Sequence, residues 1–302
     1  MEITRIQHRL EAQSWVSLPV EIRLLILTTI AEQKYPGWVS FASVCREWQH
    51  VLEKVNFHKL KLGLSCLDGF RAIISPQKQE LIRHIYFDIE LPRYKPACCC
   101  SAPRSQSTDI DDIINTIVSD GILTLFSILS TWRPANDLAL ELNVYSPSDC
   151  EHWFKNIYLS SDEVEHDADV STDASRAVIL YDDPKHGWLH GQQVESPRRS
   201  AINQLFRPTW VLLGDLLPRV PAVTCLIIRR QLRRCIAPLG LGDLLMSLNR
   251  LEHISYEPWV PPTDRACHGP GTRLHLWQEL LLTHSHYFPY VLIIHLLILR
   301  DN

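Results

Sequence analysis

Strand-like and helix-like patterns of apolar residues alternate through the middle of this 302-residue chain. In the segment 84–91, apolar and polar side chains alternate strictly, which is typical of a strand with one buried face. Residues 138–144 repeat this pattern, residues 223–228 form a continuous apolar run of strand length, and residues 251–256 are a weaker candidate. Strands that alternate with helices predict an α/β fold with a parallel sheet.

Between the expected strands, apolar residues recur at steps of three and four, as they do on one face of a helix. They are Ile110, Ile113, Ile114, Ile117 and Val118 in a first helix, Ile122, Leu125, Phe126 and Leu129 in a second, and Leu241, Leu244, Leu245 and Leu248 in a third. A leucine-rich rhythm of strand and helix is also typical of leucine-rich-repeat solenoids, whose units recur every 20 to 29 residues or roughly so. The expected strands start near residues 85, 138, 223, 251 and 291, so only one gap fits. A solenoid in this chain is therefore a degenerate one with long insertions.

The patterns divide the chain into four parts: an N-terminal tail (1–13), a helical unit (14–60), an α/β unit (61–260) and a divergent C-terminal tail (261–302). Two stretches of the α/β unit are expected to be loops. Residues 92–109 are rich in proline and serine, and residues 160–175 contain six acidic residues and no Lys or Arg. Such a run of like charges repels itself and favours a mobile segment.

The overall charge and the lack of targeting signals bound the function. A net charge of -4 predicts no general affinity for nucleic acid or for an anionic membrane. Residues 1–16 contain no apolar run that could serve as a signal-peptide core, and the apolar stretch 287–299 is shorter than the roughly 20 residues of a membrane span. Without an export signal, the nine cysteines are expected to be reduced thiols. We expect a protein of the cytoplasm, the nucleus or both.

The usual signatures of enzymes are missing from the sequence, which has no P-loop, no HExxH and no GxSxG motif. Gly240–Gly242 opens like a dinucleotide motif, but Leu245 occupies the third glycine position, so we expect a turn before a helix. The triplet Cys98–Cys100 lacks the CxxC spacing of zinc sites and predicts a plain loop. We therefore expect no catalytic residue, no metal and no cofactor.

Four arginines, Arg229, Arg230, Arg233 and Arg234, follow the apolar run 223–228. If this stretch is helical, their spacing places all four on one face. Such a cluster is suited to bind an acidic or phosphorylated peptide of a substrate. The alternatives are a solvated edge and pairing with the acidic stretch 160–175.

The helical unit begins at Leu18-Pro19-Val20-Glu21, where Pro19 is expected at the first helical position. Ile22, Leu25, Ile26 and Ile30 form one apolar stripe of this first helix, which ends at Tyr35-Pro36-Gly37, and Val44, Trp48, Val51, Leu52 and Val55 mark a second helix. Leu24 and Leu27 add apolar surface away from the first stripe. Because so short a unit has little core of its own, this surplus predicts docking to the rest of the chain or to a partner.

Two elements of this unit resemble the F-box, namely Leu18-Pro19-x-Glu21-Ile22-x-x-x-Ile26-Leu27 and Val44-Cys45-Arg46-Glu47-Trp48. From about residue 15 to 260 the chain is similar to F-box proteins of filamentous fungi. The shared segments are Tyr35–Trp38, Asn56–Leu62, Leu142–Phe154, Asp183–Trp188, Ile227–Arg234 and Leu251–Trp259. The tail 261–302 departs from the pattern of that group.

The resemblance implies a three-helix F-box that binds a Skp-type adaptor, which links it to a cullin and a RING subunit. The α/β unit would then present a protein substrate for ubiquitin transfer, and the protein itself would do no chemistry. The positions assigned to the adaptor are Leu18, Pro19, Ile22, Ile26, Val44 and Trp48, although Trp48 is equally suited to the core of the unit. Two alternatives stay open: an adaptor-binding scaffold that acts outside the ligase, and an enzyme with a site around Asp182, His186 and His190.

Overall fold

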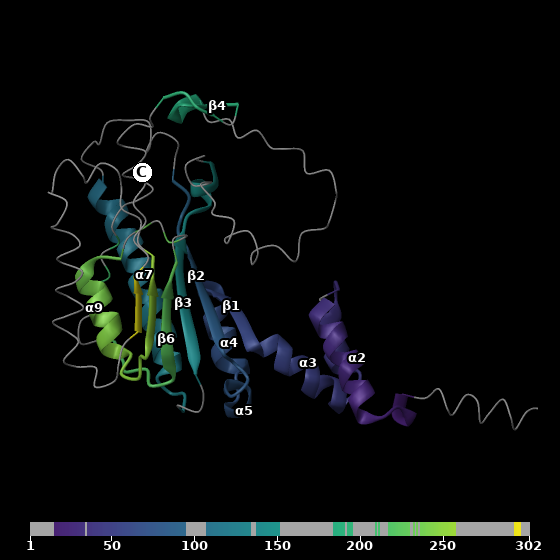
Figure 1. Cartoon of the computed structure of the whole chain (residues 1–302). Coiled ribbons are helices and arrows are strands. Elements are labelled where there is room, and N and C mark those ends of the chain that lie inside the picture. Colours follow the sequence, from purple (N-terminus) through teal and green to yellow (C-terminus); the bar gives the residue numbers. More distant parts are fainter. Residues whose placement is uncertain are drawn as a thin grey trace, which may run out of the picture.

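The computed structural model of the protein describes residues 15–33, 35–94, 107–133, 137–151, 184–190, 192–195, 217–229, 236–257 and 293–296, together with residues 209, 211, 232 and 234. Within these residues the chain forms a small N-terminal helical unit followed by an α/β unit (Figure 1). The α/β class that the sequence predicts is therefore confirmed.

The α/β unit is built on one parallel sheet. Its six strands stand in chain order: β1 (Lys59–Gly63), β2 (His84–Glu90), β3 (Leu138–Tyr145), β6 (Val223–Ile228), β7 (His253–Tyr256) and β8 (Ile293–Leu296). Each strand is added beside the previous one, and the order never reverses. Doubly wound sheets bind nucleotides in the crevice where the strand order reverses. This sheet has no such reversal among the described strands.

Helices cover one face of the sheet. They are α4 (Leu67–Ile73), the short α5 (Pro76–Gln79), α7 (Ser107–Leu129) and α9 (Pro238–Ser247). Figure 1 shows α7 and α9 on the same side of the strands. Side chains of α4, α7 and α9 share one apolar core with alternate residues of β2, such as Ile85, Phe87 and Ile89. Right-handed crossovers between strands in chain order place successive helices on the same face, which is the arrangement seen here.

The helix α7 is the longest element of the described chain. Two separate helices were expected at 110–118 and 122–129, and this prediction is wrong, because α7 is continuous through both. Its stretch Asp111–Leu129 is long and apolar enough to cross a membrane by length and composition. Val118, Ile122 and Phe126 are nevertheless buried in the core of the α/β unit, as in the core helix of a globular protein.

Three further expectations about the α/β unit need correction. The strand 84–91 was expected to have one solvent face, but Tyr86 and Asp88 are also buried, because β1 and β3 flank β2 on both sides. The expected turn at Gly240–Gly242 lies inside α9. The expected loop 92–109 overlaps the start of α7 at Ser107, and the stretch 160–175 lies outside the described residues.

The helical unit contains two α-helices, α2 (Val20–Gln33) and α3 (Arg46–His58), with 3-10 turns η1 (Trp15–Ser17) and η2 (Trp38–Ser43). The first backbone bonds of α2 run from the amides of Ile22 and Arg23 to the carbonyl of Pro19, both at 3.1 Å. Pro19 is thus the residue before the helix rather than its first residue. Gly37 adopts φ 81 after α2, a left-handed conformation that favours glycine, so the expected end of this helix is confirmed.

The helical unit is joined to the sheet without a linker. The last residue of α3, His58, directly precedes β1, so the expected boundary after residue 60 falls inside a strand. The carbonyl of His58 accepts a hydrogen bond from the amide of Arg83 at 3.0 Å. Lys78 of α5 lies over the ring of Phe57, 5.1 Å from its centroid. Figure 1 shows α2 and α3 extending away from the sheet beyond its β1 edge.

Candidate functional site

Apolar side chains project from several sides of α2, but the helix is covered on only one. It packs on α3, and Leu27 and Ala31 are fully buried. Four other large apolar side chains of α2, Val20, Ile22, Leu24 and Leu25, are between 43% and 63% exposed. The apolar side chains of a helix are normally buried against a neighbouring element. The four uncovered apolar side chains of α2 are therefore a candidate docking surface.

The stripe of α2 that faces the core differs from the one that the sequence suggests. Ile22 and Leu25, expected in the core stripe, are exposed, whereas Leu27, expected outside it, is fully buried. Ile26 and Ile30 are partly buried, as expected. Apolar periodicity selects no single face when apolar residues surround the helix, so the position of α3 decides which residues are covered.

The assigned adaptor positions fall into two groups. Pro19, Ile22 and Val44 are exposed and available to a partner, and Leu18 and Ile26 are partly buried. Further apolar surface that the sequence did not single out comes from Val16 of η1 and Phe41 of η2, which are both exposed. These residues lie in turns that have no apolar periodicity, so the sequence offered no signal for them.

Trp48 sits inside an aromatic cluster of the helical unit. Its ring centroid lies 5.3 Å from that of Trp15, with 52° between the planes. The ring of Phe41 meets it edge-on at 6.0 Å. Aromatic pairs at such distances and angles add to the stability of a small core. Trp48 itself is only partly buried, so it contributes to this cluster and still presents part of its surface.

The sheet face opposite the helices carries paired polar side chains. On β1 and β2, the Nζ atom of Lys61 lies 3.1 Å from Oδ2 of Asp88 and 5.4 Å from the centroid of the Tyr86 ring. Asn143 of β3 donates its side-chain amide to Oδ1 of Asp88 at 2.8 Å. Burial, and then the charges of Asp88 and Glu141, raise the pKa of Tyr86 far above its usual range. The Tyr86 hydroxyl therefore stays protonated and neutral.

A second polar group on the same face centres on Glu141 of β3. One carboxylate oxygen lies 2.8 Å from Nε2 of His84, and the other lies 2.8 Å from Nε of Arg229. Nearby, the hydroxyl of Tyr145 donates to the carboxylate of Glu90 at 2.9 Å. Each of these carboxylates is already engaged by a neighbour from this chain. Among the described residues, this face is thus an internally paired polar surface.

The four-arginine cluster predicted from the sequence is not present as a helical face. Residues 229, 232 and 234 are not helical, and Arg230 and Arg233 lie outside the described residues. Arg229 pairs with Glu141, and Arg234 is 2% exposed and bonded to Asp149. The prediction that Arg234 reaches an external acidic partner is therefore wrong, because the fold uses its charge inside.

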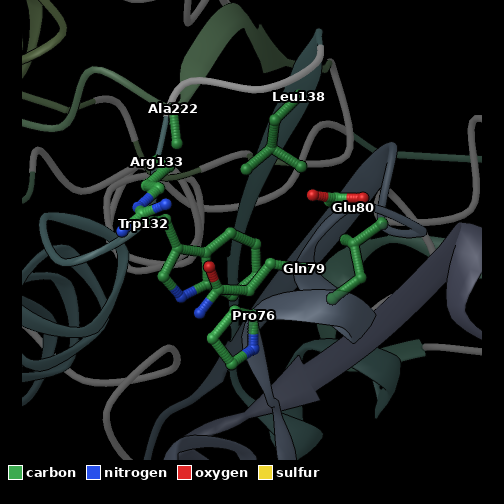
Figure 2. Close-up of a pocket in the computed structure, with 8 residues that line it drawn as sticks. Pro76, Gln79, Glu80, Trp132, Arg133, Leu138 and Ala222 are labelled. Carbon is green, nitrogen blue, oxygen red and sulfur yellow. The ribbon is translucent and has the colours of Figure 1, made fainter.

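Two small pockets lie beside α5 and the end of α7, the first towards the start of β3 and the second towards α4. The first has a volume of about 80 Å³ and is lined by Pro76, Gln79, Glu80, Ile82, Trp132, Arg133, Leu138 and Ala222. Figure 2 shows Glu80 and Arg133 on opposite sides of it. The second, of about 160 Å³, shares Gln79 and Trp132 with the first. Sites for cofactors and drug-sized ligands measure about 300–1,000 Å³, so neither pocket has room for one.

The remaining candidates for chemistry are only partly described. Among the residues that the structure places, no three His, Cys, Asp or Glu side chains form a group that could hold a metal ion. The triplet Cys98–Cys100 and Asp182 lie outside those residues. His186 is buried in the turn η6 (Pro184–His186). His190 is exposed and follows the strand β4 (Trp188–Leu189), which pairs with β5 (Gln192–Gln193).

No family model, no curated protein and no solved structure matches this chain.

Proposed function

We propose that this protein is a substrate-recognition subunit of a cullin-based ubiquitin ligase, which binds a Skp-type adaptor through its F-box-like helical unit. The observation that carries the proposal is the surface of α2, where Ile22, Leu25 and two further apolar side chains stay uncovered. Burial of a side chain of this size contributes about 1.5–3 kcal/mol. A partner that covers α2 therefore gains substantial free energy, whereas the isolated unit leaves it unused.

The F-box-like motifs support the choice of an adaptor as this partner. Leu18-Pro19 directly precedes α2, and Val44 lies just before Cys45, the N-cap residue of α3. Pro19, Ile22 and Val44 combine a match to the motif with an exposed side chain. The partly buried Leu18 and Ile26 then complete the adaptor surface, while Trp48 maintains the unit from inside.

The α/β unit is the part that we assign to a protein substrate. Its parallel strands follow one another in chain order, which supports a degenerate solenoid similar to leucine-rich repeats. Solenoids use extended surfaces to bind other proteins. We assign this subunit a recognition role in the cytoplasm, the nucleus or both, with the chemistry done by the other subunits of the ligase.

The test is co-purification of the full chain with a Skp-type adaptor and a cullin. The double variant Ile22→Ser/Leu25→Ser removes two uncovered apolar side chains of α2. Leu239→Ser/Met246→Ser is the matched control, because these α9 side chains are 64% and 54% exposed but lie in the α/β unit. We expect the first variant to lose the adaptor, and the control to retain it.

Each result of this test has a distinct meaning. A folded wild type that captures no adaptor would contradict the proposal. Capture of the adaptor without a cullin would favour the scaffold that acts outside the ligase. Equal loss in both double variants would show that general stickiness, and not the α2 surface, accounts for the capture.

A further inference from the structure

We infer that Glu47 is a positioning residue, which holds the segment around Leu18-Pro19 in the orientation that the adaptor requires. This inference rests on the proposed function for its adaptor, but its structural part can be tested without one. Glu47 lies in the first turn of α3, between the motif residues Arg46 and Trp48.

The two carboxylate oxygens of Glu47 bind two different parts of the chain. Oε2 accepts a hydrogen bond from the indole Nε1 of Trp15 at 3.1 Å. Oε1 forms an ion pair with Nε of Arg23 at the same distance, 3.1 Å. Trp15 lies before Leu18-Pro19 in the sequence, and Arg23 lies after it. A single side chain of α3 therefore ties down both ends of the segment 15–23.

The contacts of Glu47 with Trp15 and Arg23 form a clamp on the segment 15–23. Backbone hydrogen bonds within this segment complete the clamp. The amide of Leu18 donates to the carbonyl of Trp15 at 3.3 Å, and the amides of Ile22 and Arg23 donate to the carbonyl of Pro19. These bonds connect Leu18-Pro19 to the two residues that Glu47 holds. The packing of Trp15 against Trp48 also attaches η1 to α3.

The charge and the burial of the clamp suit a positioning role. The side chains of Arg23 and Glu47 are 20% and 29% exposed, so solvent screens the pair in part and its contribution to global stability is modest. The position of Glu47 in the first turn of α3 also places a negative charge at the positive end of the helix dipole. The main effect of Glu47 is therefore to restrict where Leu18-Pro19 lies. Restricting a binding segment to its bound conformation raises affinity by lowering the entropy lost on binding.

The experiment compares wild type with Glu47→Gln and Glu47→Ala in the full chain. Glu47→Gln keeps an oxygen acceptor but loses the charge, and Glu47→Ala removes both contacts. Glu53→Ala is the matched control, because Glu53 lies on the same helix and contacts Lys78 of α5 instead, at 4.0 Å. Hydrogen exchange is followed at the amides of Ile22 and Arg23, and binding kinetics are measured with a purified Skp-type adaptor.

We expect faster amide exchange in Glu47→Ala and adaptor affinity that is lower by about tenfold, with Glu47→Gln between the two. Because a loosened segment is less often in the competent orientation, the loss should lie in the association rate. The dissociation rate and the melting temperature should stay near the wild-type values. Glu53→Ala should change neither exchange at these two amides nor binding.

Several results would overturn the inference. Unchanged exchange in Glu47→Ala would show that no clamp exists. A faster dissociation rate with unchanged association would make Glu47 a direct contact of the adaptor, and a large fall in melting temperature would make it a purely structural residue. If wild type binds no adaptor, the proposed function fails, while the exchange measurement still decides whether Glu47 holds the segment.

Discussion

Arg234 and Asp149 form a buried, bidentate ion pair that joins the segments after strands β3 and β6. Nη2 of Arg234 lies 2.9 Å from Oδ1 of Asp149, and Nη1 lies 2.5 Å from Oδ2. The same carboxylate accepts hydrogen bonds from the amide of Ser146 at 2.8 Å and from the hydroxyl of Tyr94 at 3.0 Å. Tyr94 follows β2, so a single carboxylate connects the carboxyl ends of three neighbouring strands.

This pair leads to a prediction about stability. Asp149→Asn leaves the guanidinium of Arg234 buried without its counter-charge, which should lower the free energy of unfolding by about 3–5 kcal/mol. Chemical denaturation at neutral pH measures this difference. Glu90→Gln is the control, because its bond to Tyr145 is exposed, and it should change stability by no more than about 0.5 kcal/mol. Equal effects of the two variants would contradict the structural role of the pair.

The lowered pKa of Asp149 should make the stability of the protein depend on pH. Burial alone would raise the pKa of Asp149, but the hydrogen bonds and charge of Arg234, with the Ser146 amide and the Tyr94 hydroxyl, hold it below its usual value of 3.8. A lowered folded-state pKa contributes stability that is present above pH 3.8 and is lost as the pH falls through the folded value. Wild type should therefore lose more stability on acidification than Asp149→Asn does. Parallel pH profiles of the two proteins would rule this out.

Two glycines in helices should respond in opposite ways to alanine. A Cβ atom at Gly240 of α9 would lie 2.6 Å from the carbonyl oxygen of Val211, so Gly240→Ala should be destabilising. A Cβ atom at Gly69 of α4 meets nothing within 4 Å. Gly69→Ala should therefore stabilise the protein by about 0.5–1 kcal/mol, through the higher helix propensity of alanine. Thermal unfolding of both variants checks the pair, and a stabilising Gly240→Ala would show that α9 can move away from residue 211.

Thiol reactivity should distinguish Cys225 from the two exposed cysteines Cys45 and Cys66. Burial, and then the charge of Glu141, raise the pKa of the Cys225 thiol. Cys45 and Cys66 are exposed. Because the thiolate is the reactive form, Cys225 should be alkylated more slowly than Cys45 or Cys66 at neutral pH. Peptide mapping over a time course of iodoacetamide treatment measures the three rates, and Glu141→Gln should accelerate Cys225 alone.

Variants of a buried and an exposed leucine of α2 should distinguish the contribution of this helix to folding from its contribution to docking. Leu27 is fully buried, so Leu27→Ala should cost about 2–5 kcal/mol and unfold much of the helical unit. Leu25 is 63% exposed, and Leu25→Ala should leave the stability nearly unchanged while weakening adaptor capture. Circular dichroism and adaptor binding on the same samples test this division. A destabilised Leu25→Ala would mean that α2 is covered on a second side within the chain.

Local signals in the sequence were sufficient for much of the fold. The alternation in 84–91 and 138–144 and the apolar run 223–228 predicted β2, β3 and β6, since the side-chain period of a strand is visible in a short segment. Tyr35-Pro36-Gly37 correctly ended α2, because proline and glycine act on the backbone directly. The strand β1 was missed, since its five residues carry too short an alternation and depend on pairing with β2.

The candidate site was predictable in its location but not in its details. The surplus of apolar residues on α2 indicated docking, and the structure leaves Ile22 and Leu25 exposed. Which apolar residues are covered depends on where α3 packs, and the apolar residues of α2 are spread too widely around the helix to indicate that position. For the same reason Leu27 was placed outside the core stripe, although it is fully buried.

The sequence by itself determined the α/β class, most of the strands and the small apolar helical unit, because these follow from the periodicity and the turn chemistry of short segments. The tertiary structure alone decided which residues pair with the charged side chains and which side of α2 is covered. Arg229 and Arg234 look like one cluster in the sequence, but Glu141 and Asp149 bind them separately. Glu47 connects Trp15 and Arg23 only because α3 folds back on α2. Such pairings join residues far apart in the chain, and no local pattern specifies them.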